Sequence, residues 1–157
     1  MTFTAPVLNY AQLAPMLIVL AGALIGVLIE AFAPRASRHT SQLFIAVASL
    51  VAAFAALVRV RNQSSVDAAM GSVGFDGAGV LLQATILVIA LLSVFLIADQ
   101  ENFTALAAAV PGSSEERESL QLDLRVTEVY PLTLFAVAGM LLFPVSTDLI
   151  TLFVALE

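Results

Sequence analysis

The sequence predicts an all-α fold, a polytopic bundle of transmembrane helices, and its composition is the first reason. Of the 157 residues, 61% are hydrophobic and 11% are charged, whereas a soluble globular domain averages roughly 45–50% apolar and about 25% charged residues. The mean hydropathy is +1.02. A chain of this size has too little interior to bury so much apolar surface, so we expect lipid to cover it.

The second reason is that the apolar residues gather in long runs. These runs lack the alternation of polar and apolar residues that a membrane β-strand shows. A hydrocarbon core of about 30 Å takes roughly 20 helical residues. We therefore expect four full transmembrane helices and the first half of a fifth, at about residues 14–33, 42–59, 79–98, 129–145 and 147–157.

Polar stretches at residues 60–78 and 99–128 are expected to connect the helices outside the membrane. Pro34 should end the first helix, residues 35–41 should form a turn, and His39 should be solvated there. In the longer loop, Ser113 and Glu116 have capping-box spacing, so a short surface helix is one interpretation and a flexible loop is the other. One of the polar residues 146–148 is expected to cap the fifth helix.

The arginines near the helix ends predict the orientation of the chain. Cytoplasmic loops carry the excess of Lys and Arg. Four arginines follow the first and third expected helices and two follow the second, so we expect the N-terminus to lie outside the cytoplasm. The two groups are Arg35, Arg38, Arg117 and Arg125 against Arg59 and Arg61.

Composition also excludes several kinds of chemistry. The formal charge is −6, and a nucleic-acid partner is not expected because such proteins carry basic patches. The chain has no cysteine, so it cannot form a disulfide, a thiolate metal site or an iron–sulfur cluster. His39 is the single histidine and cannot form a metal site alone. We therefore expect no metal and no cofactor on this chain.

Glu157 is the main candidate for a functional residue. It lies ten residues after Thr147, which is ~15 Å along a helix and half of a hydrocarbon core of about 30 Å. A carboxylate at that depth costs at least a few kcal/mol, and such residues usually mark an ion path. A protonated Glu that hydrogen-bonds across a helix interface is the structural alternative. We expect the polypeptide to continue past Glu157, because carbonyls at a helix end in lipid would lack partners.

Two other acids are secondary candidates for a proton path. Glu30 is expected near one end of the first helix, where its side chain can reach the headgroups. Glu128 opens the fourth helix, where an acid suits the helix dipole. For both, a structural role is favoured over a role in conduction. Gly22 and Gly26 form a G-x-x-x-G pattern, which we interpret as a site of close helix packing.

Two segments carry a resemblance to a known family. They read EVYPLTLFAVAGMLL from Glu128 and STDLITLFVALE up to Glu157. They resemble helices four and five of the antiporter-like membrane subunits of respiratory complex I, most closely the bacterial subunit N type. The segments LAPML at residues 13–17 and FDG at residues 75–77 resemble it as well. Pro131 and the length of the 99–128 loop depart from the pattern.

The resemblance implies a proton-translocating subunit of NADH:quinone oxidoreductase, coupled to quinone reduction elsewhere in the complex. That family carries a glutamate in helix five, paired with a lysine on a later helix, and Glu157 matches its position. This chain has no lysine, so the partner would lie further along or on another subunit. The complex is expected to use FMN, iron–sulfur clusters and a quinone. The implied partners are other membrane subunits and the lipid of a bacterial cytoplasmic membrane.

Two other functions remain open at this point. A subunit of a multi-subunit cation/proton antiporter shares the expected architecture. A membrane scaffold that transports nothing would use Glu157 only for packing. The residues further along the chain would separate the first alternative from complex I, and an isosteric Gln at position 157 would test the second.

Overall fold

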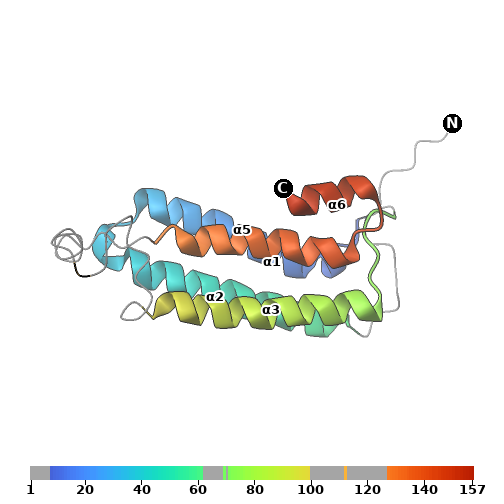
Figure 1. Ribbon diagram of the computed structural model, residues 1–157, viewed down its shortest axis with the longest axis horizontal. Coiled ribbons are helices and arrows are strands. Elements are labelled where there is room, and N and C mark those ends of the chain that lie inside the picture. Colours follow the sequence, from blue (N-terminus) through green and yellow to red (C-terminus); the bar gives the residue numbers. More distant parts are fainter. Residues whose placement is uncertain (1–7, 62–68, 70, 100–111, 113–126) are drawn as a thin grey trace.

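The computed structural model describes residues 8–61, 69, 71–99, 112 and 127–157. Within these residues the regular elements are all helices, and two isolated β-bridges join the connections. Figure 1 shows the helices running side by side. They are α1 (Tyr10–Phe32), α2 (Arg35–Val60), α3 (Gly77–Ala98), α5 (Val129–Leu142), the 3-10 helix η1 (Phe143–Val145) and α6 (Leu149–Leu156).

Three of the described helices are long and apolar enough to cross a membrane, namely Tyr10–Phe32, Ser37–Val60 and Gly77–Ala98. A further apolar stretch, Val129–Val145, is shorter. The prediction of an all-helical, apolar fold is confirmed for the described part of the chain. Of the four full membrane spans that we expected, the structure supports three by length and composition. The expected surface helix at Ser113 lies outside the described residues.

The connection between α1 and α2 is shorter than the sequence suggests. Ala33 is extended, with φ −76° and ψ 147°, as expected for a residue that precedes proline. Pro34 is the N-cap of α2, which begins at Arg35. The prediction that residues 35–41 form a turn is therefore wrong, because these polar residues form the first turns of α2. His39 lies in a helix and not in a loop.

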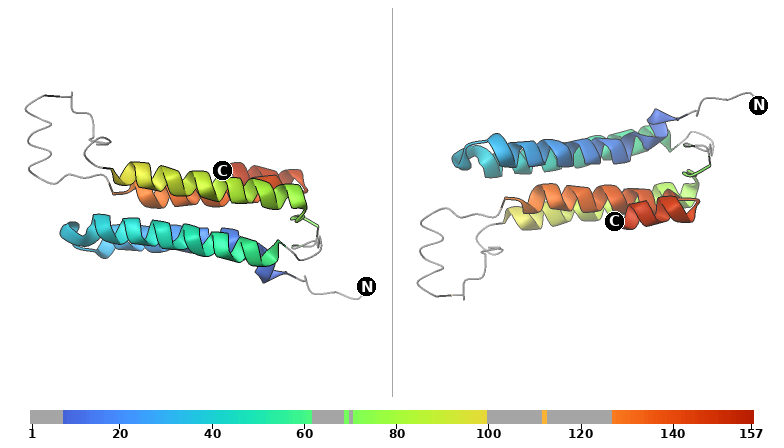
Figure 2. Two further views of the ribbon diagram at one scale, coloured as in Figure 1. Left: turned by 90° about the horizontal axis from the view of Figure 1, so that it is seen from below. Right: turned by 90° about the horizontal axis from the view of Figure 1, so that it is seen from above.

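The four longer helices form two layers, with α1 and α2 in one and α3 and α5 in the other (Figure 2). Two glycines on α1 allow close packing, one against α2 in the same layer and the other against α5 in the opposite layer. A Cβ on Gly22 would lie 2.6 Å from Cβ of Ser49 on α2, and one on Gly26 would lie 3.0 Å from Cβ of Pro131 on α5. The interpretation of Gly22 and Gly26 as packing residues is thus confirmed.

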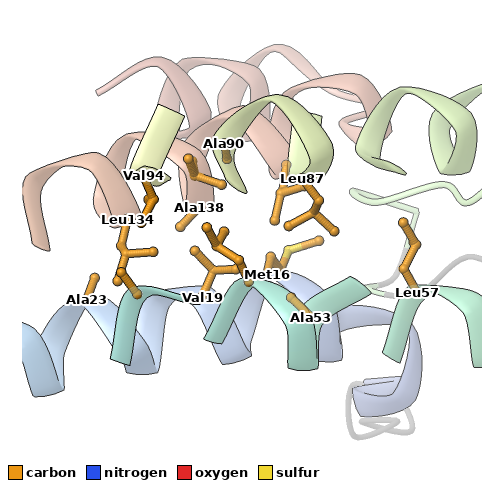
Figure 3. Close-up of a cluster of buried hydrophobic side chains, with 14 of the residues drawn as sticks. Met16, Val19, Ala23, Ala53, Leu57, Leu87, Ala90, Val94, Leu134 and Ala138 are labelled. Atoms are coloured by element: carbon orange, nitrogen blue, oxygen red, sulfur yellow. The ribbon is translucent and has the colours of Figure 1, made fainter. Parts of the chain in front are cut away.

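The core lies between the two layers and consists mainly of aliphatic side chains from all four helices, together with the aromatic rings of Phe75 and Tyr130 (Figure 3). Its members include residues whose exposed fraction is 2% or less. Many other large apolar side chains are exposed, as expected for helices that face lipid. The labelled core residues are Met16, Val19, Ala23, Ala53, Leu57, Leu87, Ala90, Val94, Leu134 and Ala138.

The far end of α5 is joined to the start of α3. Pro144 has no N–H to continue an α-helix, and α5 gives way to the 3-10 turn η1. The buried side-chain amide of Gln83 donates from Nε2 to the carbonyl of Leu141 at 2.8 Å, which satisfies one of the carbonyls in the last turn of α5. A β-bridge joins Val73 to Ser146. The connections before α3 and before α6 are thus held together.

Candidate functional site

Glu157 follows directly after α6, whose start is well defined. Asp148 is the N-cap, and its Oδ1 accepts from the backbone N–H of Thr151 at 2.6 Å. This hydrogen bond keeps the pKa of the Asp148 carboxyl below its usual value. Of the three capping residues that we considered, the structure uses Asp148. Helix α6 then runs back along α5, so its last residues lie beside the middle of α5 (Figure 1).

The depth of Glu157 follows from this geometry. It lies nine residues after Asp148, which is ~13.5 Å along a helix. The side chain is exposed. Within the described residues, no hydrogen bond or ion pair joins its carboxylate to another side chain. Glu157 is therefore not covered by the described helices.

Gly139 on α5 allows α6 to come this close. A Cβ at position 139 would lie 2.6 Å from the carbonyl oxygen of Ala155 and 3.7 Å from its carbonyl carbon. Real Cβ atoms do not approach backbone so closely, so any larger residue would push α6 away. Ala155 is buried in this contact. Because Glu157 is only two residues further on, Gly139 helps to set its position.

Glu30 lies in a second polar site, at the opposite end of the bundle from Asp148. Its Oε1 pairs with Nη1 of Arg38 at 2.9 Å. Its Oε2 accepts from Oγ1 of Thr127 at 2.7 Å and from Nε2 of Gln42 at 3.1 Å. We refer to Glu30, Arg38, Gln42 and Thr127 as the Glu30 cluster. The cluster joins α1 and α2 to Thr127, which lies just before α5.

The Glu30 cluster also satisfies backbone groups of α1. Arg38 donates to the carbonyl of Ala33 from Nη2 at 2.9 Å and from Nε at 3.3 Å. This carbonyl follows the last residue of α1, where helical partners end. Gln42 is 1% exposed, and its Nε2 also donates to the carbonyl of Gly26 at 2.8 Å. The Glu30 carboxylate faces neighbouring helices and is held by three donors; its expected position at the headgroups remains a prediction.

His39 and Tyr130 form a contact beside this cluster. Oη of Tyr130 lies 2.9 Å from Nε2 of His39, and the rings meet edge to face with centroids 5.7 Å apart. Tyr130 is 2% exposed. The prediction that His39 is a solvated loop residue is wrong, because α2 places it against the first turn of α5. His39 and Tyr130 are 91 positions apart, and the local sequence gave no signal of this contact.

Glu128 differs from Glu30 although Thr127 precedes it directly. Glu128 is the N-cap of α5 but makes no side-chain cap hydrogen bond, and its side chain is exposed. Of the two secondary candidates, the structure therefore builds a site around Glu30 and not around Glu128. The charge of Glu30 is balanced within the cluster by Arg38, whereas Glu128 faces outward.

Two buried glutamines form polar sites that the sequence did not indicate. Gln12 is 1% exposed and Gln83 is not exposed, and within the described residues the Oε1 atom of each has no hydrogen-bond partner. The signal that could have found them is the position of an amide inside an otherwise apolar run. In the part of the chain that the structure describes, no group of three His, Cys, Asp or Glu side chains could hold a metal ion.

Comparison with known proteins gives a consistent result. No protein-family model matches the chain. The chain is 41% identical over 172 residues to NADH-quinone oxidoreductase subunit N 3 of Streptomyces griseus, and this alignment includes 99% of the chain. It is 47% identical over 158 residues to the subunit N of Acidothermus cellulolyticus and 43% identical over 181 residues to that of Rhodococcus opacus, with 98% and 99% of the chain aligned.

The chain is shorter than these relatives. The alignments span 31%, 30% and 33% of their lengths, respectively. The resemblance that residues 128–157 suggested is therefore confirmed, and it extends over nearly the whole chain.

Proposed function

We propose that this chain is part of a proton-translocating, antiporter-like membrane subunit of NADH:quinone oxidoreductase, of the subunit N type. The observation that supports this most strongly is 41–47% identity over almost the full chain to three proteins with that name. The apolar helices fit a multi-pass membrane subunit. A cation/proton antiporter subunit is disfavoured, because the relatives are named for the oxidoreductase.

In this proposal Glu157 is a proton-carrying group. The capped start of α6 and its close contact with Gly139 support this role, because they fix the helix that leads to Glu157 against α5. The carboxylate can take up and release a proton, provided that water or a polar partner reaches it. The resemblance implies a lysine partner on a later helix, which would bias the charge of Glu157. The chain itself carries protons and no electrons in this scheme, and the FMN, iron–sulfur clusters and quinone belong to other subunits.

The membrane topology forms part of the proposal. Helix α5 and η1 together, Val129–Val145, would form a fourth span, shorter than the other three. A span of this length suits the lower limit of about 17 residues for a helix across a membrane. The N-terminus would lie outside the bacterial cytoplasm, and the Glu30 cluster would then lie near the cytoplasmic side.

The role of Glu157 can be tested in the assembled complex. Purified complex in proteoliposomes is supplied with NADH and a quinone, and both electron transfer and proton uptake are measured. We expect Glu157→Gln and Glu157→Ala to lower the number of protons moved per electron pair. Glu128→Gln is the matched control, because that side chain is exposed at the end of the bundle. Normal pumping by both Glu157 variants in a fully assembled complex would refute the assignment.

A further inference from the structure

An apolar groove runs along the outside of the bundle between α2 and α3. It has a volume of about 150 Å³. Leu50 and Leu87 are buried and form its floor, while Val51 and Val88 are about half exposed at its rims. The remaining wall residues are Phe54 and Leu91. Figure 2, left, looks onto the edge of the bundle where α2 and α3 lie side by side.

The chemistry of the groove restricts what can fill it. All six lining side chains are hydrocarbon, and an apolar cavity of this kind offers water no hydrogen-bond partners. A helix, with a diameter of about 10–12 Å, could only lie over the groove and project side chains into it. A flexible chain of a few methylene groups can enter it. In a chain that crosses a membrane, the acyl tails of lipids supply that chemistry.

A charged residue, Arg61, lies on the same face of α2 as the groove. Arg61 follows Phe54 by seven residues, which is nearly two helical turns, so both lie on the same face of α2. The side chain of Arg61 is exposed. Among the described residues, no carboxylate forms an ion pair with it. Arg59 is also exposed but lies two residues earlier, which is about 200° around the helix from Arg61.

The distance between the groove and Arg61 matches the thickness of one half of the hydrocarbon core. Arg61 lies eleven residues after Leu50, or ~16.5 Å along the helix. Half of a hydrocarbon core is about 15 Å. A lipid tail in the groove at the middle of the membrane would therefore have its phosphate at the level of Arg61. The long side chain of arginine can reach into the headgroup layer.

We propose that the α2–α3 groove and Arg61 together bind one anionic phospholipid. Its acyl chain lies over Leu50 and Leu87, and its phosphate pairs with the Arg61 guanidinium. This site is independent of Glu157, which lies on α6 at the other edge of the α3–α5 layer. It is also independent of the proposed transport function.

The test uses the full-length protein in nanodiscs that contain phosphatidylglycerol with a photoreactive diazirine in its acyl chain. Cross-linked peptides are identified by mass spectrometry. We expect cross-links at Phe54, Val88 and Leu91 to exceed those at the exposed apolar residues of α1. Arg61→Gln should lower groove cross-linking roughly fivefold, the effect of about 1 kcal/mol for one arginine near an anionic surface.

Matched variants make the result specific. Arg59→Gln removes the same charge from the same helix end on another face, and it should leave cross-linking unchanged. Val88→Phe fills the groove from its exposed rim and should abolish the preference for Phe54 and Leu91. Phosphatidylcholine with the same diazirine tail should label the groove less.

Three outcomes would overturn the proposal. Equal labelling of the groove and of α1 would show only the ordinary lipid layer around the protein. Equal loss in Arg59→Gln and Arg61→Gln would show that position does not matter. An unlabelled groove in the full-length protein would mean that another helix covers it.

Discussion

The ion pair between Glu30 and Arg38 allows a quantitative test of the Glu30 cluster. Glu30→Gln keeps the size of the side chain but removes its charge and one acceptor oxygen. Arg38 then loses its ionic partner and keeps its hydrogen bonds to Ala33. Thr127 and Gln42 would donate to a neutral amide instead of a carboxylate.

The magnitude follows from burial and from the number of donors. A hydrogen bond to a charged group contributes about 1.5–3 kcal/mol, and breaking a fully buried pair costs about 3–5 kcal/mol. The Glu30 and Arg38 side chains are 19% and 24% exposed, so some of the charge is screened by water. We therefore expect Glu30→Gln to lower the free energy of unfolding by about 2–3 kcal/mol.

A double-mutant cycle isolates the pair. The free energy of unfolding of the full-length protein in mixed micelles is measured by titration with a denaturing detergent, for Glu30→Gln, Arg38→Gln and the double variant. We expect a coupling energy of about 1–2 kcal/mol, because the second substitution removes a charge that the first left unpaired. Glu128→Gln is the control and should change stability by less than about 0.5 kcal/mol.

Two results would contradict this reasoning. If the losses of the two single variants add to within about 0.5 kcal/mol of the double variant, the two groups are not coupled. If Glu30→Gln is as mild as the control at position 128, the three donors contribute little, and the cluster does not hold the ends of the helices together.

Three further predictions concern single side chains. Gly139→Ala should lower both thermal stability and proton pumping, because a Cβ would meet a carbonyl of α6 at 2.6 Å; Gly77→Ala, where a Cβ meets nothing within 4 Å, is the control and should do neither. Tyr130→Phe should cost about 1 kcal/mol in detergent unfolding, since it removes one hydrogen bond to His39. The pKa of the Asp148 carboxyl is lowered in the folded protein. Its contribution to the free energy of unfolding is therefore fully present above the ordinary pKa and is lost as the pH falls through the lowered pKa. Asp148→Asn should make the free energy of unfolding depend less on pH in the acid range, and an unchanged dependence would contradict this.

The sequence predicted the features that depend on a lipid environment or on a local cause. Each described helix contains an apolar run, because a backbone inside a bilayer must satisfy its own hydrogen bonds. The cap at Asp148 was among the expected residues, because short acceptors at a helix start have a local physical cause. The depth of Glu157 along α6 followed from the rise per residue alone. Its role in proton transfer remains a prediction.

The contacts that join distant segments were not predictable. Residues 35–41 are polar and follow a proline, so they suggested a turn. They are helical because Arg38 reaches back to the end of α1 and because His39 meets Tyr130. Thr127 approaches Glu30 from 97 positions away. Nothing in a local pattern reveals such a partner, and Gly139 likewise reads only as one small residue among several.

The hairpin of α1 and α2 has a consequence for how the chain enters the membrane. Glu30 and Arg38 are separated by eight positions and meet across the connection at Pro34. Both lie at the ends of their helices, and a charge that approaches a bilayer without a partner costs more than one that is already paired. Since synthesis proceeds from the N-terminus, both are made before α3 exists. The hairpin can therefore neutralise its own charges and insert as one unit, before the later helices arrive.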